Sequence, residues 1–174
     1  VRTRFAGRVG AADVARHTAA LTAVGVEAVL TADPDRPTGT IVIVVDGAAR
    51  TMLTDRGANL GLRAADLPDV LLDGVGTLLV SGYALFDPDV REAVVDLARR
   101  ARGRGAAVAV DPASVGFLSD VGPSVFLAWL DAMGGVDLLL PNRAEAALLA
   151  GEGSDPEAWA EVLRRRARTV VVKL

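Results

Sequence analysis

The sequence predicts an α/β fold built around a mostly parallel β-sheet. In the second half of the chain, short aliphatic segments are separated by longer amphipathic segments. The aliphatic segments show no polar alternation, which is typical of strands that are buried on both faces of a parallel sheet. The amphipathic segments predict the helical crossovers that parallel strands require. We therefore expect three layers, with helices covering both faces of the sheet.

The first half of the chain combines a β-α-β pattern with a hairpin. Apolar residues at helical spacing precede Gly25, which suits a helix C-cap. A β-branched run ends in Asp46-Gly47, a pair that favours a tight turn between antiparallel strands. In chain order, the predicted elements are a strand at 3–9, a helix at 11–24, a strand at 27–31, a loop at 32–38, and hairpin strands at 40–46 and 49–54.

The second half of the chain alternates between strands and helices. Val90, Val94 and Leu97 share one face of a predicted helix. Ser154, followed three residues later by Glu157, predicts a capping box at the start of another. We expect strands at 77–81, 106–110, 136–140 and 169–174, and helices at 88–102, 124–133, 143–150 and 156–167. Because a helix separates each consecutive pair, these strands should be parallel and adjacent.

Composition excludes several classes of protein and of site. The 174 residues fit one domain, or one domain and a small appendage. The chain has no cysteine, and His17 is its single histidine, so thiolate and multi-histidine metal sites are excluded. We expect His17 to be structural, because it lies on the apolar side of a predicted helix. A net charge of −3 argues against nucleic-acid binding through a broad basic face.

The sequence contains no signal for entry into a membrane. Its longest unbroken aliphatic stretch, Ile41 to Val45, is far shorter than a transmembrane helix requires. No apolar segment typical of a signal peptide follows Arg2 and Arg4. We therefore expect a cytoplasmic protein.

The residues that follow the predicted strands indicate a ligand site. In open parallel sheets, ligands bind beyond the carboxyl ends of the strands. The exits from these strands are all polar or turn-forming: Ser81-Gly82-Tyr83, Asp111-Pro112-Ala113-Ser114, Pro141-Asn142-Arg143 with Glu145, and Lys173-Leu174. The glycine-rich dinucleotide fingerprint and the P-loop motif do not occur in the sequence.

Each of these residues also has a structural interpretation. Asn142 and Glu145 have the spacing of a helix capping box. A helix N-terminus at a strand exit also attracts phosphate, and a carboxylate beside it can hold Mg²⁺ through water. Asp111 fits a strand-ending turn or a ligand contact, and Tyr83 fits a half-buried aromatic or a ligand-flanking residue. Lys173 fits a side chain that extends to solvent.

Taken together, these segments resemble the ribokinase-like (PfkB) family of carbohydrate kinases. The strongest part is Pro-Asn-x-x-Glu-Ala at 141–146, followed by Val-Val-Lys-Leu at 171–174. The other matching segments keep the family's order: Gly7-Arg8-Val9-Gly10, Thr38-Gly39, Gly57-Ala58-Asn59, Ser81-Gly82-Tyr83 and Asp111-Pro112. The resemblance implies that 1–174 is part of one ribokinase-like, Rossmann-like α/β/α domain. Residues 38–56 would contribute to or adjoin a small β lid.

On the nucleotide side, the resemblance implies ATP and Mg²⁺. Asn142 and Glu145 would lie near the metal and the phosphates, with Mg²⁺ held through water. Lys173 would also bind the nucleotide. The resemblance further allows a monovalent cation such as K⁺.

On the acceptor side, the resemblance implies phosphorylation of a sugar hydroxyl. Thr38, Gly39 and Tyr83 would lie near the sugar pocket and the lid, and Asp111 would lie at the floor of the cleft. Lid closure would exclude water from the reaction. A homodimer formed through the lid is also compatible with the resemblance.

The sequence departs from the family pattern at three places. Two family segments are expected outside the chain: the sugar-binding Gly-Gly-x-x-x-Asn before Val1, and Gly-Ala-Gly-Asp after Leu174, which carries the general-base aspartate. Ala12 stands where the family has an acidic residue, with Asp13 one position later. We therefore expect the middle of a kinase, inactive by itself. Two alternatives stay open: a non-catalytic α/β nucleotide-binding or assembly module, and a nucleoside kinase of the same family.

Overall fold

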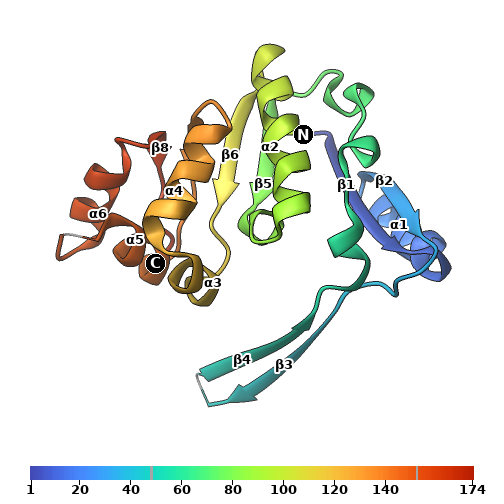
Figure 1. Cartoon of the computed structure of the whole chain (residues 1–174), viewed down its shortest axis with the longest axis horizontal. Coiled ribbons are helices and arrows are strands. Elements are labelled where there is room, and N and C mark those ends of the chain that lie inside the picture. The colour runs from blue at the N-terminus through green and yellow to red at the C-terminus, as the bar shows by residue number, and fades with distance from the viewer. Residues whose placement is uncertain (48, 152) are drawn as a thin grey trace. The chain divides into compact units, whose positions relative to one another are not determined.

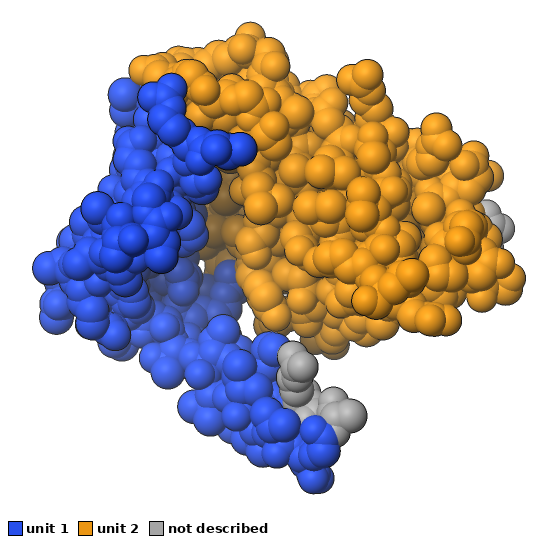
Figure 2. Space-filling view, turned by 180° about the vertical axis from the view of Figure 1, so that it is seen from behind, with its two compact units in different colours: residues 1–71 blue, residues 72–174 orange. Residues whose placement is uncertain are grey.

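The computed structural model describes residues 1–47, 49–151 and 153–174. The chain divides into two compact units, Val1–Leu71 and Leu72–Leu174, which Figure 2 shows in blue and orange. Each unit is described by itself. The interpretation of residues 1–174 as part of one domain stays a prediction.

The first unit contains the predicted β-α-β pattern (Figure 1). Strand β1 (Thr3–Gly10) pairs in parallel with β2 (Val26–Asp33), so that Gly10 lies opposite Asp33. A 3₁₀ turn at Ala11–Asp13 and helix α1 (Val14–Ala23) connect them. No residue of α1 is fully buried, and His17 is only half-buried beside Arg16, 3.3 Å away. The structural role expected for His17 stays a prediction.

The predicted hairpin is confirmed. Strand β3 (Thr40–Asp46) pairs antiparallel with β4 (Ala49–Asp55), with Thr40 opposite Asp55. In Figure 1 the hairpin extends away from the β1–β2 part of its own unit. The apolar residues 41–45 are 52–64% exposed, on both faces of the ribbon. Two strands without a covering layer are marginal in stability, so this segment is suited to contact another surface.

The second unit contains a four-stranded sheet in the order β5-β6-β7-β8. All three neighbouring pairs are parallel, which confirms the prediction from the alternation of strands and helices. The strands are β5 (Thr77–Ser81), β6 (Ala107–Asp111), β7 (Val136–Leu139) and β8 (Ala167–Val170). Right-handed crossovers between consecutively ordered strands place the connecting helices on one face. This unit therefore supplies two of the three expected layers.

Helix α2 (Pro88–Gly103) follows the predicted bounds closely and packs on β5 and β6. Asp87 caps it by accepting hydrogen bonds from the backbone N–H groups of Asp89 and Val90, both at 3.1 Å. The predicted apolar face is confirmed, since Val90, Val94 and Leu97 are buried. Further along the chain, the core contains Val108, Val110, Leu118, Phe126, Leu130 and Leu139.

One helix was not predicted, and its cause is a local break in the chain. Helix α3 (Val115–Val121) precedes α4 (Pro123–Ala132), and Gly122 separates them with φ of 87°. Glycine adopts that angle without strain, and Pro123 suits the first position of the next helix. Gly116 inside the short α3 weakens its helical signal in the sequence.

The ends of the last two elements differ from the prediction. Helix α5 (Arg143–Ala150) matches its predicted bounds, but α6 (Pro156–Leu163) ends earlier than expected. The predicted N-cap Ser154 is wrong, because Asp155 caps α6 by accepting from the N–H of Ala158 at 2.9 Å. Strand β8 begins earlier than predicted, at the buried Ala167, which pairs with Val136 of β7, and it ends at Val170 rather than at Leu174.

The chain continues alongside β7 after β8 has ended. The N–H of Val171 donates to the carbonyl of Leu139 at 2.9 Å, and the N–H of Lys173 donates to that of Pro141 at 2.8 Å. These bonds bring Lys173 to the carboxyl end of the sheet. Among the described residues, no helix is long and apolar enough to cross a membrane.

Candidate functional site

The carboxyl ends of β6, β7 and β8 bring three of the predicted site residues together. Lys173 Nζ donates to Asp111 Oδ2 at 2.6 Å, across a separation of 62 positions in the sequence. Asn142 and Lys173 form a parallel backbone bridge. The Lys173 and Asp111 side chains are 45% and 36% exposed, so both can reach a ligand from solvent.

Glu145 joins this cluster through Asn142. The N–H of Asn142 donates to Glu145 Oε2 at 2.9 Å, and Asn142 Nδ2 donates to Oε1 at 2.8 Å. In return, Asn142 Oδ1 accepts from the N–H of Glu145 at 2.9 Å. The expected capping box is therefore present at the start of α5. Each carboxylate oxygen has lone pairs left after these bonds, so the cap does not exclude a second role through water.

Burial is the main influence on the ionisation of Glu145. The side chain is 1% exposed, and this burial raises the pKa of Glu145 above its ordinary value. The hydrogen bond from the Asn142 backbone opposes that rise, the charge on Asp111 adds to it, and Lys173 lowers it. Burial therefore favours the protonated form of Glu145, and the charges of Asp111 and Lys173 shift that balance in opposite directions.

The loop after β6 is tightly fitted against the end of β5. A Cβ at Gly82 would lie 2.2 Å from the carbonyl oxygen of Pro112, so only glycine fits there. Ala113 has φ of 77°, and within the described ranges it is the one non-glycine residue with positive φ. Its N–H donates to Asp111 Oδ1 at 3.2 Å. Strain of this kind clusters at functional sites, and here it lies next to a predicted ligand residue.

Tyr83 lies at the exit of β5 with its ring edge against Phe117. The ring centroids are 6.0 Å apart and the planes meet at 87°, a favourable edge-to-face arrangement. Tyr83 remains partly exposed. Both interpretations from the sequence therefore stay open, because the ring contacts Phe117 of α3 while the side chain is also accessible to solvent.

Thr38 and Gly39 lie in the first unit, at the base of the hairpin. Thr38 Oγ1 donates to Asp13 Oδ2 at 2.6 Å and accepts from the N–H of Gly10 at 3.0 Å. The hydrogen bond from the Thr38 hydroxyl is the largest of the influences that lower the pKa of Asp13. A Cβ at Gly39 would lie 2.6 Å from Asn59 Nδ2, so the backbone approaches its neighbours closely there.

The residues of the second unit fit a phosphate-bearing ligand better than a directly bound metal ion. In the part of the chain that the structure describes, no three acidic or histidine side chains form a metal-binding group. Both oxygens of Glu145 already accept hydrogen bonds from Asn142. Lys173 and the N-terminus of α5 suit phosphate, and the two carboxylates suit Mg²⁺ through intervening water.

Sequence reasoning missed the partners that hold the predicted residues. The Asp111–Lys173 and Asp13–Thr38 contacts join segments that lie far apart in the chain, so spacing carries no signal for them. A pocket of about 290 Å³ lies at the amino-terminal ends of β6, β7 and β8. It is lined in part by Arg102, Asp137 and Arg168. It contains none of the predicted site residues.

Comparison with known proteins gives one family match. Residues 1–174 match the profile of the pfkB family of carbohydrate kinases over their whole length. None of the curated proteins gives a significant match.

Several solved structures share the fold. An adenosine kinase from Sinorhizobium meliloti is 25% identical, with a TM-score of 0.86 over 98% of this chain and 52% of that one. A protein described as ribokinase II from E. coli, in complex with ATP and Mg²⁺, is 20% identical with a TM-score of 0.81 over 99% and 56%. A fructokinase from Xylella fastidiosa with bound ATP is 21% identical, with a TM-score of 0.80 over 98% and 56%. The chain spans about half the length of these structures.

Proposed function

The chain belongs to the pfkB family of carbohydrate kinases, and we propose that it carries the nucleotide-phosphate edge of an ATP-dependent phosphotransferase. The acceptor is a sugar hydroxyl, and Mg²⁺ accompanies ATP. The main support is the convergence of Asp111, Asn142, Glu145 and Lys173 at one edge of the parallel sheet. Because the chain spans about half of the related structures, the activity is proposed for the complete gene product.

In this proposal, some residues at the carboxyl ends of the strands bind phosphate and others bind the metal. Lys173 supplies the positive charge for a nucleotide phosphate, and α5 presents its N-terminal N–H groups to the same region. Glu145 would hold Mg²⁺ through water, with Asn142 fixing its orientation, and we add Asp111, which the resemblance places at the floor of the cleft, as a second carboxylate within reach of the metal. Bound Mg²⁺ would neutralise charge on the phosphates that are transferred. The protein's own contribution is positioning and electrostatic stabilisation.

A nucleoside acceptor is the second candidate, and one comparison favours it. The adenosine kinase from Sinorhizobium meliloti combines a TM-score of 0.86 with 25% identity. A fructokinase with a similar share of this chain covered is 21% identical. Sugar and nucleoside kinases therefore both remain candidates within the family. A monovalent cation such as K⁺, a homodimer formed through the hairpin and a cytoplasmic location stay predictions.

Acceptor-dependent ADP formation tests this proposal. We expect the product of the complete reading frame that encodes residues 1–174 to release ADP from ATP and Mg²⁺ when a sugar from a panel of hexoses, pentoses and ketoses is added. A parallel panel of purine and pyrimidine nucleosides serves as the comparison. Omission of Mg²⁺ is the control, since it should abolish the signal.

The outcomes separate the candidates. Turnover with nucleosides alone would replace the sugar acceptor by the second candidate. ATP binding without turnover on either panel would favour a non-catalytic nucleotide-binding or assembly module and would contradict the proposal.

A further inference from the structure

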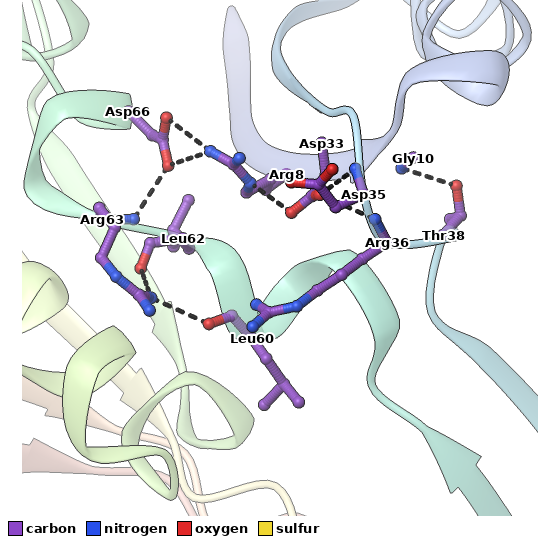
Figure 3. A network of polar contacts seen from close by, with 10 residues as sticks. All are labelled: Arg8, Gly10, Asp33, Asp35, Arg36, Thr38, Leu60, Leu62, Arg63 and Asp66. Carbon is purple, nitrogen blue, oxygen red and sulfur yellow. Dashed lines mark hydrogen bonds and ion pairs between the residues drawn. The ribbon is translucent and has the colours of Figure 1, made fainter.

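A partly buried ion-pair network lies beside the base of the hairpin (Figure 3). Arg8 of β1 is its centre. Its Nε lies 2.9 Å from Asp33 Oδ2, and its Nη1 lies 3.1 Å from Asp66 Oδ2. The side chains of Arg8, Asp33 and Asp66 are 19%, 5% and 10% exposed. Two carboxylates therefore share one guanidinium in a place that water reaches poorly.

Asp33 uses its two oxygens for different partners. While Oδ2 accepts from Arg8, Oδ1 accepts from the N–H of Asp35 at 3.0 Å and from that of Arg36 at 2.9 Å. The hydrogen bond from Arg8 is the largest cause that lowers the pKa of Asp33 to about 2. Asp33 thus ties the β1–β2 sheet to the segment that leads into the hairpin, as Figure 3 shows.

That segment, residues 33–39, has little room to move. The carbonyl of Pro37 accepts from the N–H of Ala58 at 2.8 Å. A Cβ at Gly57 would lie 2.4 Å from that same carbonyl oxygen, and one at Gly10 would lie 2.8 Å from the N of Thr38. Asp33 holds the start of the segment through the N–H groups of Asp35 and Arg36, and Thr38 holds its end through Asp13 and Gly10.

Asp66 holds the other side of Arg8 and belongs to a different segment. It accepts from the N–H of Arg63 at 2.9 Å, and Arg63 Nη1 donates to the carbonyls of Leu60 and Leu62, both at 2.9 Å. The described hydrogen bonds of Asp66 go to the guanidinium of Arg8 and to the backbone N–H of Arg63. Asp33 and Asp66 therefore accept hydrogen bonds from the same guanidinium. Of these two carboxylates, Asp33 is the one that also bonds the segment before the hairpin.

We infer that Asp33 is a positioning residue for acceptor binding, which acts by fixing residues 33–39 and thereby the place of Thr38 and Gly39. This inference rests on the proposed function, in which Thr38 and Gly39 lie on the acceptor side. The physical basis is preorganisation: a segment that is already ordered loses less conformational entropy when the acceptor binds. A loosened segment would weaken acceptor binding more than it would slow the transfer step.

The test compares Asp33→Asn with Asp66→Ala. An asparagine at 33 has one oxygen, so its NH₂ group must face either Arg8 or the N–H groups of Asp35 and Arg36. Asp66→Ala weakens the hold on Arg8 from the other side and leaves those N–H groups bonded. In the active enzyme, we expect Asp33→Asn to raise the KM for the acceptor at least about tenfold, with the KM for ATP and kcat within about twofold. Asp66→Ala should leave all three within about twofold.

Amide hydrogen exchange supplies a readout that does not depend on turnover. Exchange at Asp35 and Arg36 should speed up at least about tenfold in Asp33→Asn and stay near wild type in Asp66→Ala. Equal acceptor KM values in the two variants, with the wild type active, would overturn the inference and leave the proposed function intact. An inactive wild type would instead remove the proposed function, and the inference with it.

Discussion

Replacing Glu145 by glutamine is expected to lower turnover at least about tenfold, which corresponds to about 1.4 kcal/mol of barrier. The variant keeps the size of the side chain but removes the charge that, in the proposed function, would hold Mg²⁺ through water. Its NH₂ group would also face one of the two donors of Asn142, either the backbone N–H or Nδ2. That conflict should cost about 1 kcal/mol of helix-cap stability. Raising the Mg²⁺ concentration should recover part of the lost turnover, because binding of the metal is what the variant weakens.

A matched loss of a helix cap provides the control. Asp155 caps α6 by accepting from the N–H of Ala158 at 2.9 Å, away from the carboxyl edge of the sheet. Asp155→Ala should also cost about 1 kcal/mol of stability, with turnover within about twofold of wild type. If Glu145→Gln had wild-type turnover at low Mg²⁺, Glu145 would be an ordinary capping residue.

Replacing Arg8 by methionine is expected to lower the stability of the first unit clearly more than replacing the exposed Arg36 does. The change would leave Asp33 and Asp66 without their shared cation in a poorly solvated place, while methionine fills much of the volume. Leaving a buried charge unpaired costs more than the pair itself contributes. Urea denaturation, followed by a probe in the first unit, measures the loss.

Arg36→Met is the matched control for this prediction. Arg36 is exposed and takes part in the network through its backbone N–H, which the variant keeps. Its stability should stay within about 0.5 kcal/mol of wild type. A loss for Arg8→Met no larger than that of the control would mean that the network adds little to folding.

The strands and the hairpin could be predicted because their signals are local. An aliphatic run such as 77–81 or a β-branched run such as 40–46 carries its own evidence, and the intervening helices fix the parallel order. The helix at 143–150 matched its predicted bounds for the same reason: Asn142 and Glu145 mark its start and Gly151, with φ of 69°, its end.

The features that escaped prediction depend on contacts between distant segments. Strand β8 begins where Ala167 pairs with Val136 of β7, and the N–H of Lys173 donates to the carbonyl of Pro141. The candidate site was only partly predictable for this reason. Residue types and strand exits pointed to Asp111 and Glu145, but the Lys173–Asp111 pair and the role of Asp33 depend on the folded chain.

The central claim is that the carboxyl edge of the β5–β8 sheet binds the phosphates of ATP. The most direct test is to measure the KM for ATP in Lys173→Met. Arg168→Met is the control, because it removes an exposed cation from the amino-terminal end of β8 in the same sheet. The Lys173–Asp111 pair is partly exposed, so losing it should cost at most about 1 kcal/mol of stability. The account predicts that Lys173→Met raises the KM for ATP about tenfold or more, with the acceptor KM nearly unchanged, and that Arg168→Met leaves both near wild type. An unchanged KM for ATP in Lys173→Met, or an equal rise in both variants, would contradict it.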